Sequence, residues 1–177
     1  MAVTKMTTRL VAMARRNTPV FYPAYQGLVS KLLERPWQSS DGIDPAELQE
    51  QLQQSVAAQQ LQELGNEPAA AHLVPLALQE FYLALGVSEM METNHFFFDP
   101  DELEIRDNMV MFVEDATEST VWAVPLDQVT LPDPIIYRRT VGADEPDGAG
   151  TFESTDSTVS EFITDILTWN YTEDDLD

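Results

Sequence analysis

The chain contains no cysteine, which excludes disulfide bonds, thiolate metal sites and cysteine nucleophiles. No apolar run approaches the roughly 20 residues that are needed to span a bilayer, and the N-terminus lacks the continuous apolar core of a secretory signal. Basic residues are also scarce, because nine Lys and Arg stand against 31 Asp and Glu. We therefore expect a cytoplasmic protein that does not cross a membrane.

The few basic residues are unevenly distributed. Residues 1–35 carry six of them against Glu34 alone, a charge of +5, whereas residues 36–177 carry 3 − 30 = −27, which together give −22. The three basic residues of the second part are Arg106, Arg138 and Arg139. Such a body repels phosphates, which argues against nucleic acid as a partner, and it attracts a basic protein. The alternative is that the acidity serves solubility, including solubility in a high-salt cytoplasm.

A length of 177 residues suits one domain with a real core. We expect a basic N-terminal extension at 1–20, a single α+β domain at 21–172 and an acidic tail at 173–177. The extension is basic and free of acids, as is typical of a transit peptide or a helix that lies on a membrane surface. A helix that docks on the acidic body is the alternative for the same segment.

Apolar residues recur at helical spacing in four segments of the chain. Asp44, Pro45 and Glu47 form a capping pattern at the start of the second helix, whose apolar positions include Val56. Pro75 opens the third helix and Gly86 follows it, while Thr158 caps the fourth. The helices are predicted over residues 21–35, 44–64, 75–85 and 158–169.

Short apolar segments between the third and fourth helices predict an antiparallel twisted sheet that extends from residue 96 to residue 153. Residues 109–113 follow the polar turn 106–108, residues 120–124 follow a second turn, and a short strand is expected near Phe152. We expect Trp122 to lie in the core, because large aromatic residues in alternating strands usually pack inward. The predicted fold class is α+β, with the sheet packed against the helices.

The order of these signals resembles a known family. A Pro-started helix with Phe81-Tyr82 is followed by an apolar strand ending in Glu114, a strand with Trp122, the element Asp133-Pro134-Ile135-Ile136-Tyr137 and a closing helix that ends near Trp169. This order is similar to that of the SUKH superfamily, the Smi/Knr-type proteins, over roughly the last hundred residues. The resemblance implies a SUKH-like fold and includes no catalytic signature. Its bacterial members are immunity proteins that bind and neutralise a toxin, often a nuclease.

No pattern in the chain specifies a reaction. A Gly-x-Ser-x-Gly motif is absent, and the glycines between 142 and 150 stand among acids that would repel a phosphate. His95 precedes Asp99, Asp101 and Glu102, but the glycine that an EF-hand loop requires is missing and successive strand carboxylates alternate faces. We therefore predict no catalytic residue, no metal site and no cofactor.

The sequence favours a non-enzymatic protein-binding module, and the resemblance implies an immunity-type protein that neutralises a basic toxin. A regulatory or scaffold protein of the same fold, with acidic flanks that keep it soluble, is the first alternative. A hydrolase that uses a carboxylate-bound cation is the second alternative. The residues predicted to recognise the partner are Glu114, Asp115, Glu118, Asp133 and Tyr137.

Overall fold

The computed structural model describes residues 20–65, 73–142 and 150–172. Its α-helices are α2 (Tyr22–Leu33), α3 (Pro45–Gln54), α4 (Val56–Glu63), α5 (Leu76–Leu85) and α6 (Val159–Thr172). Its strands are β1 (His95–Phe97), β2 (Glu104–Arg106), β3 (Met109–Asp115), β4 (Thr120–Pro125), β5 (Ile135–Thr140) and β6 (Glu153–Thr158). The predicted α+β class is confirmed. Apart from Val20, the predicted basic extension lies outside the described residues, as does the acidic tail.

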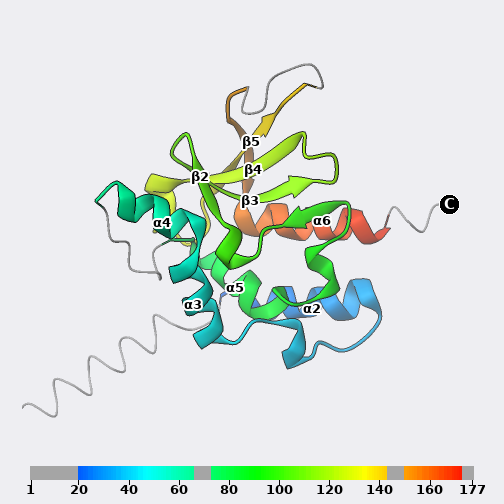
Figure 1. Ribbon diagram of the computed structural model, residues 1–177. Coiled ribbons are helices and arrows are strands. Elements are labelled where there is room, and N and C mark those ends of the chain that lie inside the picture. Colours follow the sequence, from blue (N-terminus) through cyan, green and yellow to red (C-terminus); the bar gives the residue numbers. More distant parts are fainter. Residues whose placement is uncertain (1–19, 66–72, 143–149, 173–177) are drawn as a thin grey trace, which may run out of the picture.

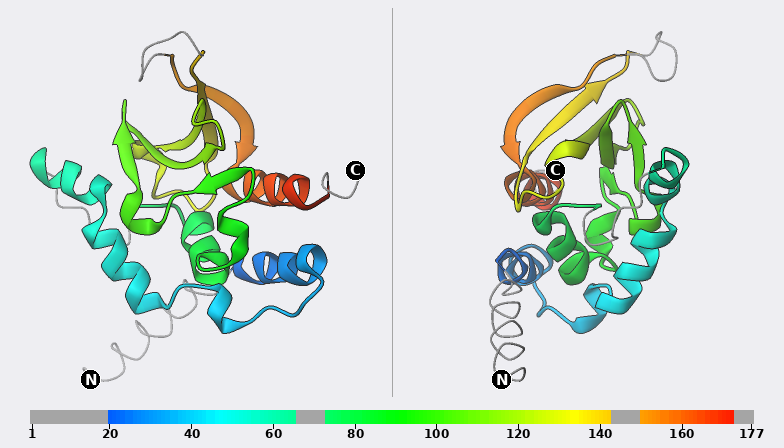
Figure 2. Two further views of the ribbon diagram at one scale, coloured as in Figure 1. Left: turned by 45° about the vertical axis from the view of Figure 1, so that its right-hand side comes forward. Right: turned by 90° about the vertical axis from the view of Figure 1, so that its left-hand side faces the viewer.

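The strands form one antiparallel sheet in the order β1-β3-β4-β5-β6, and β2 pairs with β3 on the same edge as β1. Helices α6, α5 and α2 lie in layers beneath the sheet, while α3 and α4 flank it beside β2 (Figures 1 and 2). The main core fills the space between these helices and one face of the sheet.

Helix α5 lies at the centre of the helical layers and contacts α2, α3 and α6. Its sequence is apolar on nearly every side, which is typical of a helix that is buried all round. The hydroxyl of Tyr82 donates to the carbonyl of Phe98, which ties the helix to the chain that follows β1. Gly86 follows the helix as predicted, but its φ of −66° is ordinary. A Cβ there would lie 2.6 Å from Ile43 Cδ1, so close packing explains the glycine better than helix termination does.

Helix α5 also carries a buried acid, Glu80, which is only 4% exposed. Its Oε1 accepts hydrogen bonds from the backbone N–H groups of Val20 at 2.6 Å, Phe21 at 2.9 Å and Tyr22 at 3.2 Å. These groups stand at the start of α2, where the first N–H groups of a helix have no partner within the helix. Glu80 therefore caps a helix that lies about 60 residues away in the sequence.

The prediction of one continuous helix over residues 44–64 is wrong in one respect. The helix breaks at Ser55, which separates α3 from α4. Ser55 is extended, with ψ of 154°, and its hydroxyl accepts from the Ala58 N–H while it donates to the Leu52 carbonyl. Serine favours this capping geometry over a helix interior. The break turns Val56 outward, where it is 43% exposed, although the continuous helix placed it on the buried side. The predicted cap at the start is present in part, since Asp44 accepts from the Ala46 N–H, whereas Glu47 accepts from the side-chain amide of Gln51.

The end of the chain contains more regular structure than predicted. Strands β5 and β6 pair with each other, so the sheet extends to Thr158 and not only to residue 153. Thr158 still accepts the Glu161 N–H at the start of α6, as predicted, but that helix continues past residue 169 to Thr172. Within the described residues, no helix is long and apolar enough to cross a membrane.

Strand β3 contains a register shift between Met111 and Val113. Val113 lies opposite Trp122, and both are buried in the main core, as predicted for Trp122. Glu114 lies opposite Val121, on the other face of the sheet. A bulge of this kind adds one residue to a strand and reverses the alternation after it. Glu114 therefore shares a face with Met111, which strict alternation from Met111 would not allow.

We predict that Glu80→Gln lowers the free energy of unfolding by about 2 kcal/mol, because a buried carboxylate that accepts several partly buried N–H groups becomes a neutral amide. Chemical denaturation followed by tryptophan fluorescence measures this difference. Glu50→Gln on the exposed side of α3 is the control and should change stability by less than about 0.5 kcal/mol. Equal effects of the two substitutions would contradict the capping role of Glu80.

Candidate interaction surface

One face of the sheet is not covered by a helix in the described part of the chain, and we call it the outer face. Its residues follow from the strand pairing, because residues directly opposite each other point to the same side of a sheet. A first row across the strands consists of Phe96, Glu114, Val121 and Arg139. A second row consists of Glu104, Met111, Ala123, Tyr137 and Ser154.

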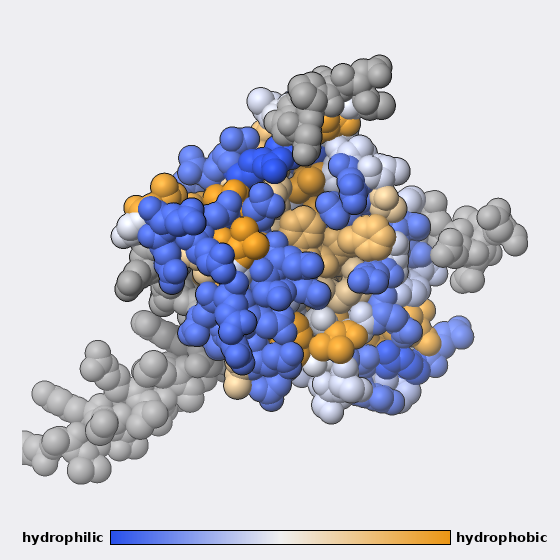
Figure 3. Space-filling view, in the orientation of Figure 1, coloured by the Kyte–Doolittle hydropathy of each residue, from blue (hydrophilic) through white to orange (hydrophobic). Residues whose placement is uncertain are grey.

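The outer face has an apolar floor. Met109, Met111 and Ala123 form a small buried cluster that is separate from the main core. The side chains packed against it are half-buried and come from the strands and the segments beside them, namely Phe98, Val121, Tyr137 and Phe152. In the view of Figure 3, hydrophilic side chains predominate over α3, and hydrophobic side chains gather beside them over the sheet.

A hollow of about 420 Å³ lies over this face, and we call it the outer hollow. Its apolar lining includes Phe98, Met111 and Val121. Its charged lining consists of the acids Glu104, Glu114 and Glu118 and the bases Arg106 and Arg139. Apolar surface surrounded by charged groups is the usual composition of a protein–protein interface.

The turn between β3 and β4 forms one end of the outer hollow and is organised by Asp115. Its carboxylate accepts hydrogen bonds from the backbone N–H groups of Ser119 and Thr120 and from the hydroxyls of Thr117 and Ser119. Partial burial raises the pKa of Asp115, but these four hydrogen bonds outweigh it and hold the pKa below the usual 3.8. Asp115 therefore stabilises the turn as an ion and is saturated with donors from its own chain.

Glu114 is in the opposite electrostatic situation. Partial burial raises its pKa above the usual 4.5, and the negative charges of Glu118, Asp115 and Glu102 raise it further. A cation brought to this position would relieve that repulsion. Glu114 is thus better suited than Asp115 to contact a basic partner directly.

The five residues predicted for recognition do not all lie together. Glu114, Asp115 and Glu118 meet at the β3–β4 hairpin, where Glu118 occupies a turn position with φ of 56°. Tyr137 shares the outer face with Glu114 and packs on its apolar floor. Asp133 lies before the opposite end of β5, where its carboxylate accepts from the N–H and the hydroxyl of Ser160. Asp133 therefore caps α6 and is not part of the outer hollow.

Sequence reasoning missed the two basic residues of the outer hollow, Arg106 and Arg139. They come from β2 and β5, which are not neighbours in the sheet. Arg106 lies 3.6 Å from Glu104 on its own strand. A signal was present, since these are two of the three basic residues between positions 36 and 177. The sequence did not place them together because the path of β5 was not predicted.

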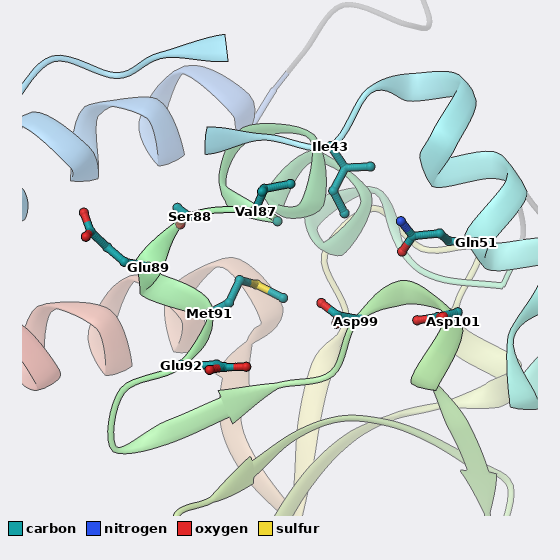
Figure 4. Close-up of a pocket in the computed structure, with 10 residues that line it drawn as sticks. Ile43, Gln51, Val87, Ser88, Glu89, Met91, Glu92, Asp99 and Asp101 are labelled. Carbon is teal, nitrogen blue, oxygen red and sulfur yellow. The ribbon is translucent and has the colours of Figure 1, made fainter. Parts of the chain in front are cut away.

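A larger cavity of about 790 Å³ lies between α3 with the residue Ile43 before it, residues 86–92 after α5, and residues 99–101 ahead of β2. Figure 4 shows the side chains of Glu92, Asp99, Asp101 and Gln51 directed into this cavity, and that of Glu89 directed away from it. Burial raises the pKa of Asp99, and the charges of Glu102, Asp101 and Glu92 raise it further. None of the described residues that line the cavity is basic, although Arg35 lies 3.2 Å from Glu89 at its edge.

His95, considered above as a metal ligand, lies on the core side of the sheet. Its Nδ1 is 3.1 Å from Asn170 Oδ1 on α6, and its ring packs between Trp122 and Trp169. Asp99 and Asp101 line the larger cavity instead. Among the described residues, no three His, Asp or Glu side chains are arranged to hold a metal ion.

Comparisons with known proteins found no matching family model, no matching curated protein and no matching solved structure. The assignment of a function therefore depends on the geometry of the chain itself.

We predict that two neighbouring substitutions on β3 have opposite effects at neutral pH. Asp115→Asn should lower the melting temperature, because the lowered pKa means that ionised Asp115 stabilises the fold above pH 3.8 and that this stability is lost at lower pH. Glu114→Gln should raise it, because the raised pKa means that ionisation of Glu114 destabilises the fold as the pH rises past 4.5.

Thermal unfolding of both variants at pH 7 and at pH 3 measures this contrast. The two differences in melting temperature from the unsubstituted chain should shrink at pH 3, because this pH lies below the usual pKa of 4.5 for Glu114 and of 3.8 for Asp115. A change of the same sign in both variants at pH 7 would contradict the assignment.

Proposed function

We propose that this protein is a non-enzymatic binding module that recognises a basic protein through its outer face, in the manner of an immunity protein that neutralises a basic toxin. The observation that carries the proposal is the outer hollow, in which Glu104, Glu114 and Glu118 surround an apolar floor. This arrangement provides both contributions that a protein interface requires. The apolar floor favours desolvation, and the acids select the charge of the partner.

The charge of the whole chain supports the same proposal. Residues 36–177 carry 3 − 30 = −27, so a basic protein is attracted before it makes contact. Steering of this kind raises the association rate and weakens as salt screens the charges, over a distance of about 10 Å at 0.1 M salt. A basic nuclease toxin fits this chemistry, because its substrate-binding surface attracts phosphates and would equally attract carboxylates.

The organisation of the hairpin supports a preformed recognition surface. Asp115 fixes the turn with four hydrogen bonds, which holds the neighbouring Glu118 and the end of β3 in place. Groups that are held in position before binding lose less conformational entropy on binding. Glu114 is additionally repelled by its neighbours in the free protein, so that a bound cation stabilises it.

We predict that the triple variant Glu104→Gln, Glu114→Gln, Glu118→Gln loses salt-sensitive binding to basic proteins. The full chain serves as bait in a lysate of the source cells, with washes at low and then at high salt, and the retained basic protein is identified. Its association rate with the triple variant should be about 10-fold lower at low salt and should depend less on salt concentration.

The matched control is Glu47→Gln, Glu50→Gln, Glu63→Gln, which removes the same charge from exposed positions on α3 and α4. It should lower the association rate only slightly, because these residues lie away from the outer hollow. Equal association rates for the two triple variants would show that the net charge of the chain sets the rate and that the outer hollow is not a specific binding surface. Retention of only neutral, salt-insensitive proteins would favour the scaffold alternative.

A further inference from the structure

We propose that the outer hollow contains a carboxylate-binding site centred on Arg139. This inference deepens the proposed function and depends on it only for the identity of the molecule that carries the carboxylate. Arg139 is 3% exposed, and neither its Nε nor its Nη1 has a hydrogen-bond partner among the described residues. Its guanidinium packs 5.2 Å from the ring centre of Phe152. A buried charged donor without a partner is unfavourable, so this group is poised to gain one.

The other arginines near acids behave differently. Arg35 holds Asp41 at 2.7 Å and Glu89 at 3.2 Å, and Arg106 lies 3.6 Å from Glu104. None of the ion pairs between described residues includes Arg139, although Glu114 stands in the same row of the outer face. Val121 on β4 separates the two, and two inter-strand spacings put their backbones about 10 Å apart. Among the described residues, no carboxylate therefore pairs with the guanidinium, although Arg139 lines the outer hollow.

The chemistry of the hollow selects a carboxylate as that group. A planar carboxylate with a single charge matches the fork of a guanidinium through two parallel hydrogen bonds. A phosphate carries more charge and would be repelled more strongly by Glu104, Glu114 and Glu118, which line the same hollow. In a partner that carries one acidic group among its basic residues, the basic residues would contact the acids of the hollow and the acidic group would contact Arg139. The carboxylate can come from a side chain, a chain terminus or a small free acid.

Thermal unfolding of the full chain in sodium acetate, compared with sodium chloride at equal ionic strength, tests the site. Acetate at ten times its dissociation constant should raise the melting temperature by roughly 3 °C, because it binds the folded state alone. Arg138→Gln, an exposed neighbour with the same change in charge, should keep this rise, and Arg139→Met should lose it. An equal rise in Arg139→Met, or an equal rise of the unsubstituted chain in phosphate, would overturn the proposal.

A second measurement does not depend on the folding of the Arg139→Met variant. The ¹⁵N–¹H signal of Arg139 Nε in the unsubstituted chain should shift and saturate with acetate and should not move with chloride. A signal that moves with neither ion would mean that Arg139 finds its partner within its own chain, and it would overturn the proposal.

Two further probes in the same titration distinguish the sources of the carboxylate. N-acetylglycylglycine presents the carboxylate of a chain terminus, and N-acetylaspartate amide presents that of a side chain. The probe with the lower dissociation constant indicates which of the two the site prefers. These titrations use the isolated protein, so they test the carboxylate site without the basic partner. A failure of the carboxylate site is therefore distinguishable from a failure of the proposed binding to a basic protein.

Discussion

The burial of helix α5 is the constraint on which the rest of the structure depends. The helix is enclosed by α2, α3 and α6, and Tyr82 joins it to the segment that follows β1. Its one buried acid, Glu80, satisfies three backbone N–H groups at the start of α2, so a single side chain couples the beginning of the described chain to its centre. Among the described residues, helices cover one face of the sheet, and the outer hollow lies over the other face.

The sequence allowed the prediction of those elements whose signals are local. The spacing of apolar residues predicted α2, α5 and α6 to within a few residues, and the polar turn at 106–108 is present with positive φ at Asp107 and Asn108. The break at Ser55 was missed because the apolar spacing continues across it. The role of Glu80 was missed because an acid in a helix normally indicates a solvated position.

The outer face was predictable only in part. The run Met109–Val113 is apolar throughout, so it contains no alternation that would reveal the bulge that sets the face of Glu114. Arg139 and Glu114 lie in the same row of the outer face through pairing across three strands, which no single segment encodes. The acidic hairpin was found because its residues are adjacent in sequence, while Asp133 was grouped with it although that residue caps α6. Features that depend on neighbouring residues could therefore be predicted from the sequence, whereas the register between distant strands could not.

The central claim is that the outer face binds a basic protein. Site-specific photo-crosslinking in the source cells tests it most directly, with the crosslinker placed either at Thr117, which is exposed and lines the outer hollow, or at Gln53, which is exposed on α3. The account predicts that a basic protein is crosslinked from position 117 and not from position 53. The same products from both positions, or no product from position 117, would contradict it.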